Sequence, residues 1–104
     1  MSTGKTRIRI PIPQKELNEF CRRYKVQRMA LFGSVLRKNF TKNSDVDILV
    51  AFDPSARVGL KAFSRIQREL SELLQRPVDL VPMDGLKPVI RDLVLADIEE
   101  VYAA

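Results

Sequence analysis

The chain has 104 residues, a length that supports one hydrophobic core and therefore one domain. Its 45% hydrophobic and 30% charged residues are typical of a globular protein, and no apolar run is long enough to cross a membrane. The formal net charge of +5 favours a polyanionic partner, although a solvated basic face explains it equally well. Histidine is absent, which excludes every site that depends on an imidazole and leaves carboxylates, hydroxyls, lysine and arginine for any chemistry.

The cellular compartment is suggested by the cysteine content and the first residues. Cys21 is the single cysteine, so an intramolecular disulfide framework is excluded. The start of the sequence lacks the apolar segment of a secretory signal. We therefore expect a cytoplasmic protein, in which Cys21 is a small apolar filler on a helix rather than a reactive thiol.

The first elements follow from local patterns. Residues 6–13 alternate apolar and basic side chains and contain two prolines, which predicts an extended arm or an edge strand. Apolar residues at helical spacing predict an amphipathic helix over 13–24, and the β-rich segment 26–32 predicts a strand. We therefore divide the chain into an arm, 1–12, and a single domain, 13–104.

The remaining elements alternate between strands and helices. The continuous apolar run at 45–52 predicts a central strand, 59–76 a helix, and 77–83 a third strand. A helix is predicted over 87–98, and the tail at 99–104 is either a short edge strand or the frayed end of that helix. The buried face of the helix over 59–76 is expected to consist of Leu60, Phe63, Ile66, Leu70, Leu73 and Leu74. This order indicates an α/β two-layer sandwich, with a small mixed or antiparallel sheet of three to four strands flanked by helices.

Three aspartates stand inside or at the start of apolar strands. Asp45 and Asp47 alternate along one strand, so their side chains point to the same face about 7 Å apart. Asp79 lies between Val78 and Leu80, and it joins the pair if the two strands are neighbours. Carboxylates gathered in this way repel one another and are costly to bury unless a cation neutralises them. Carboxylate oxygens are the ligands that Mg²⁺ prefers, so the three aspartates predict a metal site.

A Gly-Ser pair precedes the aspartates and supplies a second half of the predicted site. Gly33 permits a tight turn after the strand at 26–32, and the following backbone N–H groups and the Ser34 hydroxyl can contact a phosphate. Arg37 can contact the same phosphates through paired hydrogen bonds. Each signal alone is ordinary, because Gly-Ser is a common turn and Asp-x-Asp is a common cap. Their combination at the ends of three predicted strands favours a phosphate and metal site.

The segment 31–52 resembles the G-S-x₁₀-D-x-D signature of the nucleotidyltransferase superfamily that includes DNA polymerase beta. The ten residues 35–44 separate Ser34 from Asp45, and Ser44 gives the familiar S-D-x-D form. From about residue 14 to the end, the chain is similar to the minimal nucleotidyltransferase (MNT) group, single-domain antitoxins that accompany HEPN-domain toxins. One departure is Lys38, where many relatives have glycine after the motif arginine.

The resemblance implies a nucleotidyltransferase fold and a specific reaction. Asp45 and Asp47 would hold two Mg²⁺ ions, and Asp79 would complete the metal site and help to activate the acceptor hydroxyl. The nucleotide-binding positions would be Gly33, Ser34, Arg37 and Ser44. The implied activity is transfer of AMP from ATP, by in-line attack and release of pyrophosphate, to a tyrosine hydroxyl of a HEPN toxin encoded nearby.

Two other functions are compatible with the same residues. The protein could be a non-catalytic antitoxin that neutralises its partner by binding, or it could transfer nucleotides to RNA. Nucleic acid is the less favoured partner, because no aromatic platform for RNA is visible and the aromatic residues fit a core. A protein partner is expected to dock on segment 88–102 or on the basic arm at 5–9.

Overall fold

The computed structural model describes residues 10–36 and 44–104, so most of the expected N-terminal arm lies outside the described residues. The elements in chain order are α1 (Gln14–Arg23), β1 (Val26–Phe32), the 3₁₀ turn η1 (Gly33–Leu36), β2 (Val46–Phe52), α2 (Leu60–Leu74), β3 (Val78–Pro82), the 3₁₀ turn η2 (Met83–Gly85), α3 (Pro88–Leu95) and β4 (Ile98–Ala103). Each helix and strand predicted within the described residues is present, with small shifts at the ends. The tail of the chain forms a strand, β4, rather than the end of a helix.

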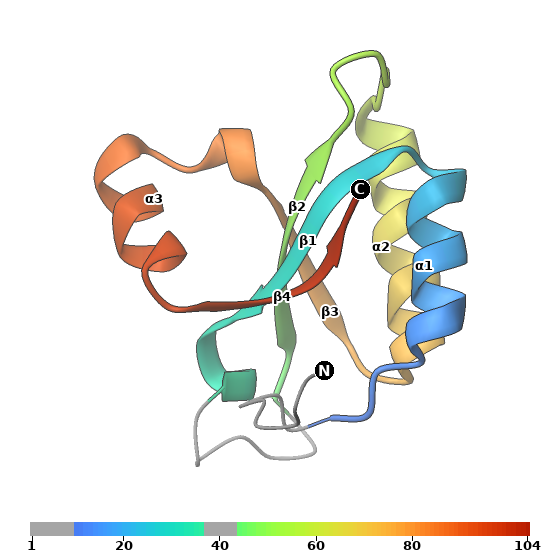
Figure 1. Cartoon of the computed structure of the whole chain (residues 1–104), viewed down its shortest axis with the longest axis horizontal. Coiled ribbons are helices and arrows are strands. Elements are labelled where there is room, and N and C mark those ends of the chain that lie inside the picture. Colours follow the sequence, from blue (N-terminus) through green and yellow to red (C-terminus); the bar gives the residue numbers. More distant parts are fainter. Residues whose placement is uncertain (1–9, 37–43) are drawn as a thin grey trace.

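The four strands form one mixed sheet in the order β3-β2-β1-β4 (Figure 1). Strand β1 is antiparallel to both β2 and β4, whereas β2 is parallel to β3. Strand β2 therefore has a neighbour on each side, as its continuous apolar sequence predicted. The predicted fold class is confirmed, and the open choice between a mixed and an antiparallel sheet is decided by the parallel β2–β3 pair.

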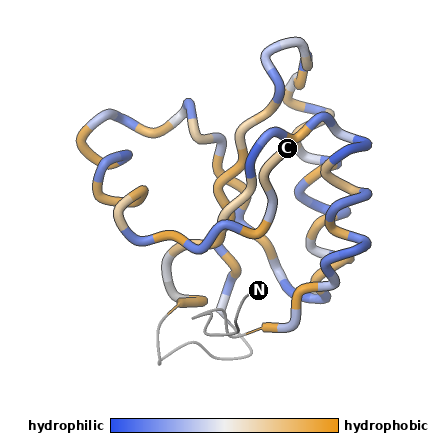
Figure 2. Tube along the Cα trace, in the orientation of Figure 1, coloured by the Kyte–Doolittle hydropathy of each residue, from blue (hydrophilic) through white to orange (hydrophobic). Residues whose placement is uncertain are grey.

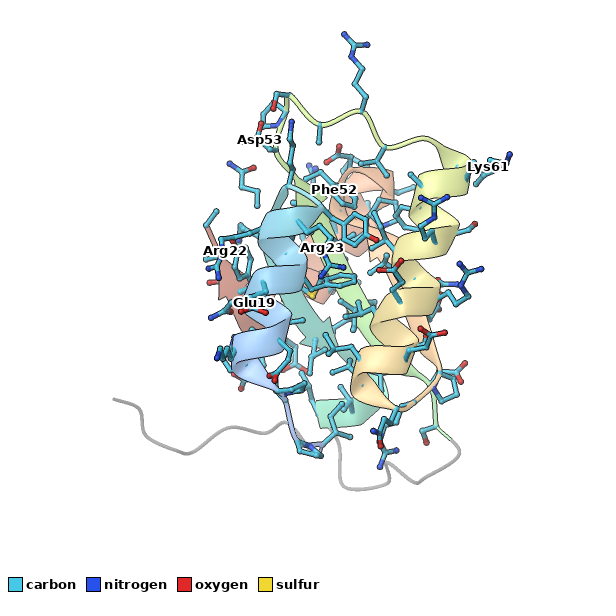
Figure 3. The ribbon with its side chains drawn as sticks, turned by 90° about the vertical axis from the view of Figure 1, so that its right-hand side faces the viewer. Glu19, Arg22, Arg23, Phe52, Asp53 and Lys61 are labelled. Atoms are coloured by element: carbon cyan, nitrogen blue, oxygen red, sulfur yellow. The ribbon has the colours of Figure 1, made fainter. Side chains whose placement is uncertain are left out.

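Helices α1 and α2 lie side by side on one face of the sheet and cover it (Figure 1). Hydrophobic and hydrophilic residues alternate around both helices in Figure 2, and the charged side chains of Glu19, Arg22 and Lys61 lie at the outside of this layer in Figure 3. Cys21 is fully buried in the core, and this burial raises the pKa of its thiol to about 12. The expectation that Cys21 is an inert apolar filler is therefore supported.

The prediction for Leu60 is wrong. Ile66, Leu70 and Leu74 are buried as expected, but Leu60 is 84% exposed. The reason is its position, because Leu60 is the first residue of α2 and precedes the turns of the helix that pack on the sheet. The apolar periodicity of the helix continues one turn beyond the surface that can bury it.

Helix α3 stands on the other side of the sheet from α1 and α2 (Figure 1). None of its residues is buried, and three of its apolar side chains face solvent, with Val89 75%, Ile90 48% and Leu93 72% exposed. None of the described helices is long and apolar enough to cross a membrane. The fold thus presents a covered face, packed by α1 and α2, and a second face beside which α3 stands.

Candidate active site

The register of the parallel strands brings two of the predicted aspartates together. Asp47 on β2 pairs directly with Asp79 on β3, between the pairs Val46–Val78 and Ile48–Leu80. These four flanking apolar side chains are buried in the core beneath the helices. Because side chains alternate along a strand, Asp47 and Asp79 point to the opposite face, on adjacent strands about 4.8 Å apart. Asp45 lies just before β2, two residues from Asp47, and its charge acts on the Asp47 carboxylate.

Gly33 brings the end of β1 against this pair. Phe32 is the last residue of β1 and pairs with Asp47 across the antiparallel ladder. Gly33 then turns the chain with φ +77°, a left-handed conformation that favours glycine. A Cβ atom at Gly33 would collide with Oδ2 of Asp47. The backbone of the predicted phosphate turn therefore begins in contact with the predicted metal ligand.

Asp47 is the carboxylate on which the charges of the two other predicted aspartates act. Its carboxylate is partly buried, and its pKa is raised above the ordinary value first by desolvation and then by the charges of Asp79 and Asp45. This shift means that both neighbouring carboxylates act on Asp47, so the three predicted aspartates form one electrostatic group. The ionised form of Asp47 is disfavoured, and a cation at this position would relieve the repulsion.

The donor set fits a hard divalent cation that arrives with a phosphate. Within residues 10–36 and 44–104, no three acidic, histidine or cysteine side chains are gathered closely enough to form a protein-only metal cage. Mg²⁺ does not require one, because it is usually held by one or two carboxylates, water and the oxygens of a substrate phosphate. The charges of Asp79 and Asp45 both raise the pKa of Asp47, so negative charge is concentrated at this point. These residues therefore fit Mg²⁺ together with a nucleotide.

The nucleotide-binding positions predicted from the sequence are only partly described. Gly33 and Ser34 open the turn η1, and Ser44 directly precedes Asp45 and is half-buried. Arg37 lies outside the described residues, so its predicted phosphate contact stays a prediction. The roles of all these positions, and of the three aspartates, likewise remain predictions.

Sequence reasoning missed two polar side chains of α2. Oε1 of Gln67 accepts a hydrogen bond from the backbone N–H of Leu80 at 2.9 Å, and Oγ of Ser71 accepts one from the N–H of Val78 at 3.1 Å. These bonds hold the backbone on both sides of Asp79. The available signal was weak, because a glutamine and a serine four residues apart beside an apolar stripe are common on helices.

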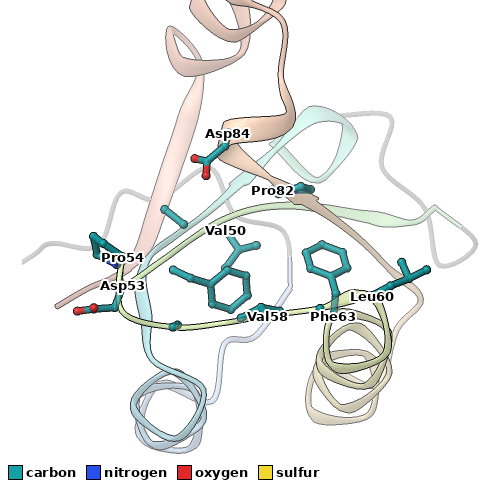
Figure 4. A pocket seen from close by; sticks show the side chains of 12 residues that line it. Val50, Asp53, Pro54, Val58, Leu60, Phe63, Pro82 and Asp84 are labelled. Atoms are coloured by element: carbon teal, nitrogen blue, oxygen red, sulfur yellow. The ribbon is translucent and has the colours of Figure 1, made fainter.

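A cavity of about 600 Å³ lies at the opposite end of β2 from Asp45 and Asp47 (Figure 4). It is lined by Val50, Ala51, Phe52, Asp53, Pro54, Ala56, Val58, Gly59, Leu60, Phe63, Pro82 and Asp84. This lining is mostly apolar, and it has two carboxylates but neither lysine nor arginine. This cavity therefore lacks basic side chains that could contact a phosphate, and it is separate from the site predicted at the aspartate end of the strand.

The model of the nucleotidyltransferase domain family matches residues 14–100, which include Gly33, Asp45, Asp47 and Asp79. The chain belongs to the nucleotidyltransferase domain family. It is also similar to the protein adenylyltransferase MntA of Thermococcus cleftensis, with 39% identity over 87 residues, 82% of this chain and 81% of that protein. The family predicted from residues 31–52 is thus confirmed.

Solved structures share the fold of this nucleotidyltransferase domain. One is a toxin–antitoxin complex with AMP-PNP, at 23% identity and a TM-score of 0.71, covering 89% of this chain and 75% of that chain. Another is the tri-AMPylated HEPN toxin of Shewanella oneidensis in complex with MNT antitoxin, at 22% identity and a TM-score of 0.63, covering 88% and 70%. At this level of identity the likeness establishes the fold alone.

Substitution of Gly33 by alanine tests the contact between the turn and the carboxylate. We expect Gly33→Ala to lose at least about tenfold in nucleotide binding and to unfold about 1–3 kcal/mol more easily, because the new Cβ meets Asp47 and the positive φ is strained. Gly59→Ala is the matched control, since a Cβ at Gly59 meets nothing within 4 Å. Isothermal calorimetry and urea denaturation measure both effects, and equal behaviour of the two variants would contradict the assignment.

Substitution of Asp47 by asparagine tests the repulsion in metal-free protein. Because the pKa of Asp47 is raised on folding, ionisation of this group costs stability as pH rises from its ordinary value of 3.8 through the folded value. Asparagine cannot ionise, so Asp47→Asn should be more stable than wild type at neutral pH, and this gain should vanish below the ordinary pKa of the carboxyl. Urea denaturation with EDTA at a series of pH values measures this gain. Asp92→Asn on α3 controls for the removal of one negative charge.

Proposed function

We propose that this protein is a Mg²⁺-dependent adenylyltransferase that transfers AMP from ATP to a tyrosine hydroxyl of a partner HEPN toxin and so acts as the antitoxin of the pair. The observation that carries the proposal is the position of Asp47, which is flanked by Asp79 on the neighbouring strand and contacted by the Gly33 turn. A metal-binding carboxylate beside a phosphate-binding turn is what transfer of a nucleotide to a hydroxyl requires.

The similar proteins support both ATP as the donor of AMP and a HEPN toxin as the acceptor. MntA of Thermococcus cleftensis is named a protein adenylyltransferase, which means that its acceptor is a protein and its donor carries AMP. Among the structures of the same fold, one holds AMP-PNP and another contains an AMPylated HEPN toxin with its MNT antitoxin. The shared fold and the shared family make the same pair of substrates the best candidates for this chain.

The proposed mechanism assigns one task to each part of the site. Backbone N–H groups of the turn that begins at Gly33 would hold the triphosphate, and Asp45 and Asp47 would hold two Mg²⁺ ions. The bound ions would neutralise charge on the phosphates and favour departure of pyrophosphate. Asp79 would complete the metal site and help to activate the tyrosine hydroxyl, by drawing away its proton, for in-line attack on the α-phosphorus. The bond from phosphorus to pyrophosphate breaks as the bond to the tyrosine oxygen forms, and positioning and charge supply the rate.

A transfer assay tests this function. Wild-type protein, incubated with ATP labelled in the adenosine moiety, Mg²⁺ and its neighbouring HEPN protein, should label the HEPN protein. The double variant Asp45→Asn/Asp47→Asn should lose at least about a hundredfold of this activity, because the metal ligands are removed. Addition of EDTA should abolish labelling by wild type, and Glu19→Gln, at an exposed carboxylate on α1, should leave it unchanged.

The two alternative functions are separable by the same assay. Suppression of toxicity without any label transfer by wild type would favour a non-catalytic antitoxin that acts by binding. Transfer to RNA instead of protein would favour the third function. RNA is the weaker candidate, because several aromatic residues that could stack on bases belong to the core or pack against it: Phe20, Tyr24, Phe52, Phe63 and Tyr102.

Docking of the acceptor protein is proposed to involve α3. The side chains of Asp47 and Asp79 point away from α1 and α2, toward the side of the sheet on which α3 stands (Figure 1). An acceptor hydroxyl must approach from that side, where Val89, Ile90 and Leu93 present an exposed apolar surface. The second docking candidate, the basic arm at 5–9, lies outside the described residues.

Substitution of Leu93 on α3 by aspartate tests docking of the HEPN protein separately from the transfer reaction. Leu93→Asp should weaken binding of the HEPN protein by about tenfold or more, because it puts a charge into an apolar contact. Leu60→Asp is the matched control, since Leu60 is a still more exposed leucine on α2. Surface plasmon resonance measures both, and ATP binding should be the same in both variants. Equal loss of HEPN binding in the two variants would remove α3 as the docking surface.

Two further proposals concern the whole chain. We keep residues 13–104 as one domain preceded by an arm at 1–12, although Ile10, near the end of that arm, is buried in the core. We also propose a cytoplasmic location, which is supported by the free and buried thiol of Cys21 and by the need for ATP.

A further inference from the structure

Strand β3 carries Asp79 and lies at an edge of the sheet, with β2 as its neighbour on one side. The backbone groups of alternate residues point toward β2, as shown by the bond from the N–H of Val46 to the carbonyl of Pro77 at 2.9 Å. By this alternation the N–H groups of Val78 and Leu80 point away from β2 and have no partner within the sheet. An edge strand of this kind needs another element to hold it in register.

Helix α2 supplies those partners with two side chains. The N–H of Leu80 donates to Oε1 of Gln67 at 2.9 Å, and the N–H of Val78 donates to Oγ of Ser71 at 3.1 Å. The Ser71 hydroxyl in turn donates to the carbonyl oxygen of Gln67 at 3.0 Å, which orients its oxygen as an acceptor. Both bonds form together because four helical residues rise about 6 Å and two strand residues rise about 6.6 Å.

The two anchored N–H groups are those immediately before and after Asp79. The side chains of Val78 and Leu80 are buried toward α2, so the Asp79 carboxylate is directed to the opposite face beside Asp47. A parallel pair is less stable per residue than an antiparallel one, and β3 has only five residues. A slip of one residue would turn the Asp79 carboxylate toward the core.

We propose that Gln67 and Ser71 are positioning residues for the reaction, which hold Asp79 beside Asp47 through the backbone of β3 without touching the substrates. This proposal rests on the proposed function, which gives Asp79 its roles in binding the metal and in activating the acceptor hydroxyl. It goes beyond the aspartates of the family signature, since the two residues lie on the far side of the strand, on the face of α2 that packs against it.

The test uses paired variants on the full chain. Gln67→Met keeps the length of the side chain but removes the acceptor oxygen, and Gln67→Glu restores an acceptor at the same position. Ser71→Ala and Ser71→Thr form the same kind of pair for the hydroxyl. Ser64→Ala is the control, because Ser64 is an exposed serine on the same helix.

Three measurements are made on each variant: amide hydrogen exchange at Val78 and Leu80 by NMR, Mn²⁺ affinity by EPR without acceptor, and kcat and KM for AMP transfer. Gln67→Met and Ser71→Ala should speed exchange at Leu80 and Val78 respectively, and lower kcat between about tenfold and a hundredfold. KM for ATP should change less than about twofold, because the Gly33 turn lies on the other side of β2. Gln67→Glu and Ser71→Thr should recover most of the lost kcat.

The outcomes separate this proposal from the proposed function. Faster exchange with unchanged kcat would show that Gln67 and Ser71 only stabilise the edge of the sheet, and would overturn the proposal. Equal losses in Gln67→Met and Gln67→Glu would also overturn it. If wild type transfers no AMP, the proposed function fails. The Mn²⁺ affinity then decides the positioning role, which requires a loss of at least about threefold in Gln67→Met. If Gln67→Met does not fold, the Ser71 pair gives the same readouts.

Discussion

The parallel pairing of β2 with β3 is the contact on which the candidate site depends. It sets Asp47 directly beside Asp79, although 31 residues separate them along the chain. The pairing is stabilised by burial of the flanking apolar side chains, which lie beneath α1 and α2. The apolar residues that flank the two aspartates therefore face the helices, and the two carboxylates lie on the other face, where desolvation and the neighbouring negative charges raise the pKa of Asp47.

That repulsion is tolerated because the core is placed on the opposite side. Ile48 and Leu80 are almost fully buried, whereas Asp47 is only partly exposed and Asp79 is open to solvent. A bound cation would relieve the repulsion between the carboxylates, so the free energy that the fold loses at this point would strengthen binding of the cation and its phosphate. Functional sites commonly carry such a local loss of stability. The contact of Gly33 with Asp47 adds the end of β1 to the candidate site, because the predicted phosphate-binding turn begins at Gly33, directly against the Asp47 carboxylate.

Much of this arrangement could be predicted from local sequence. The apolar run at 45–52 and the periodic helix at 59–76 were both recognisable, and both are present as β2 and α2. Leu60 was misassigned because periodicity reports which face of a helix is apolar and does not report where the sheet beneath it ends. The tail at 99–104 could not be decided locally, because its strand structure depends on pairing with β1.

By itself, the sequence determined the elements, the family signature and the three aspartates, because these depend on spacing along the chain. Tertiary structure alone decided that β3 is parallel to β2, that Asp79 meets Asp47, and that Gly33 leaves no room for a side chain. It also decided that Gln67 and Ser71 hold the edge of β3. Strand register and the contacts at the edge of the sheet join residues that are far apart in the chain. Because their stability comes from packing of the whole core, they cannot be predicted from a local sequence pattern.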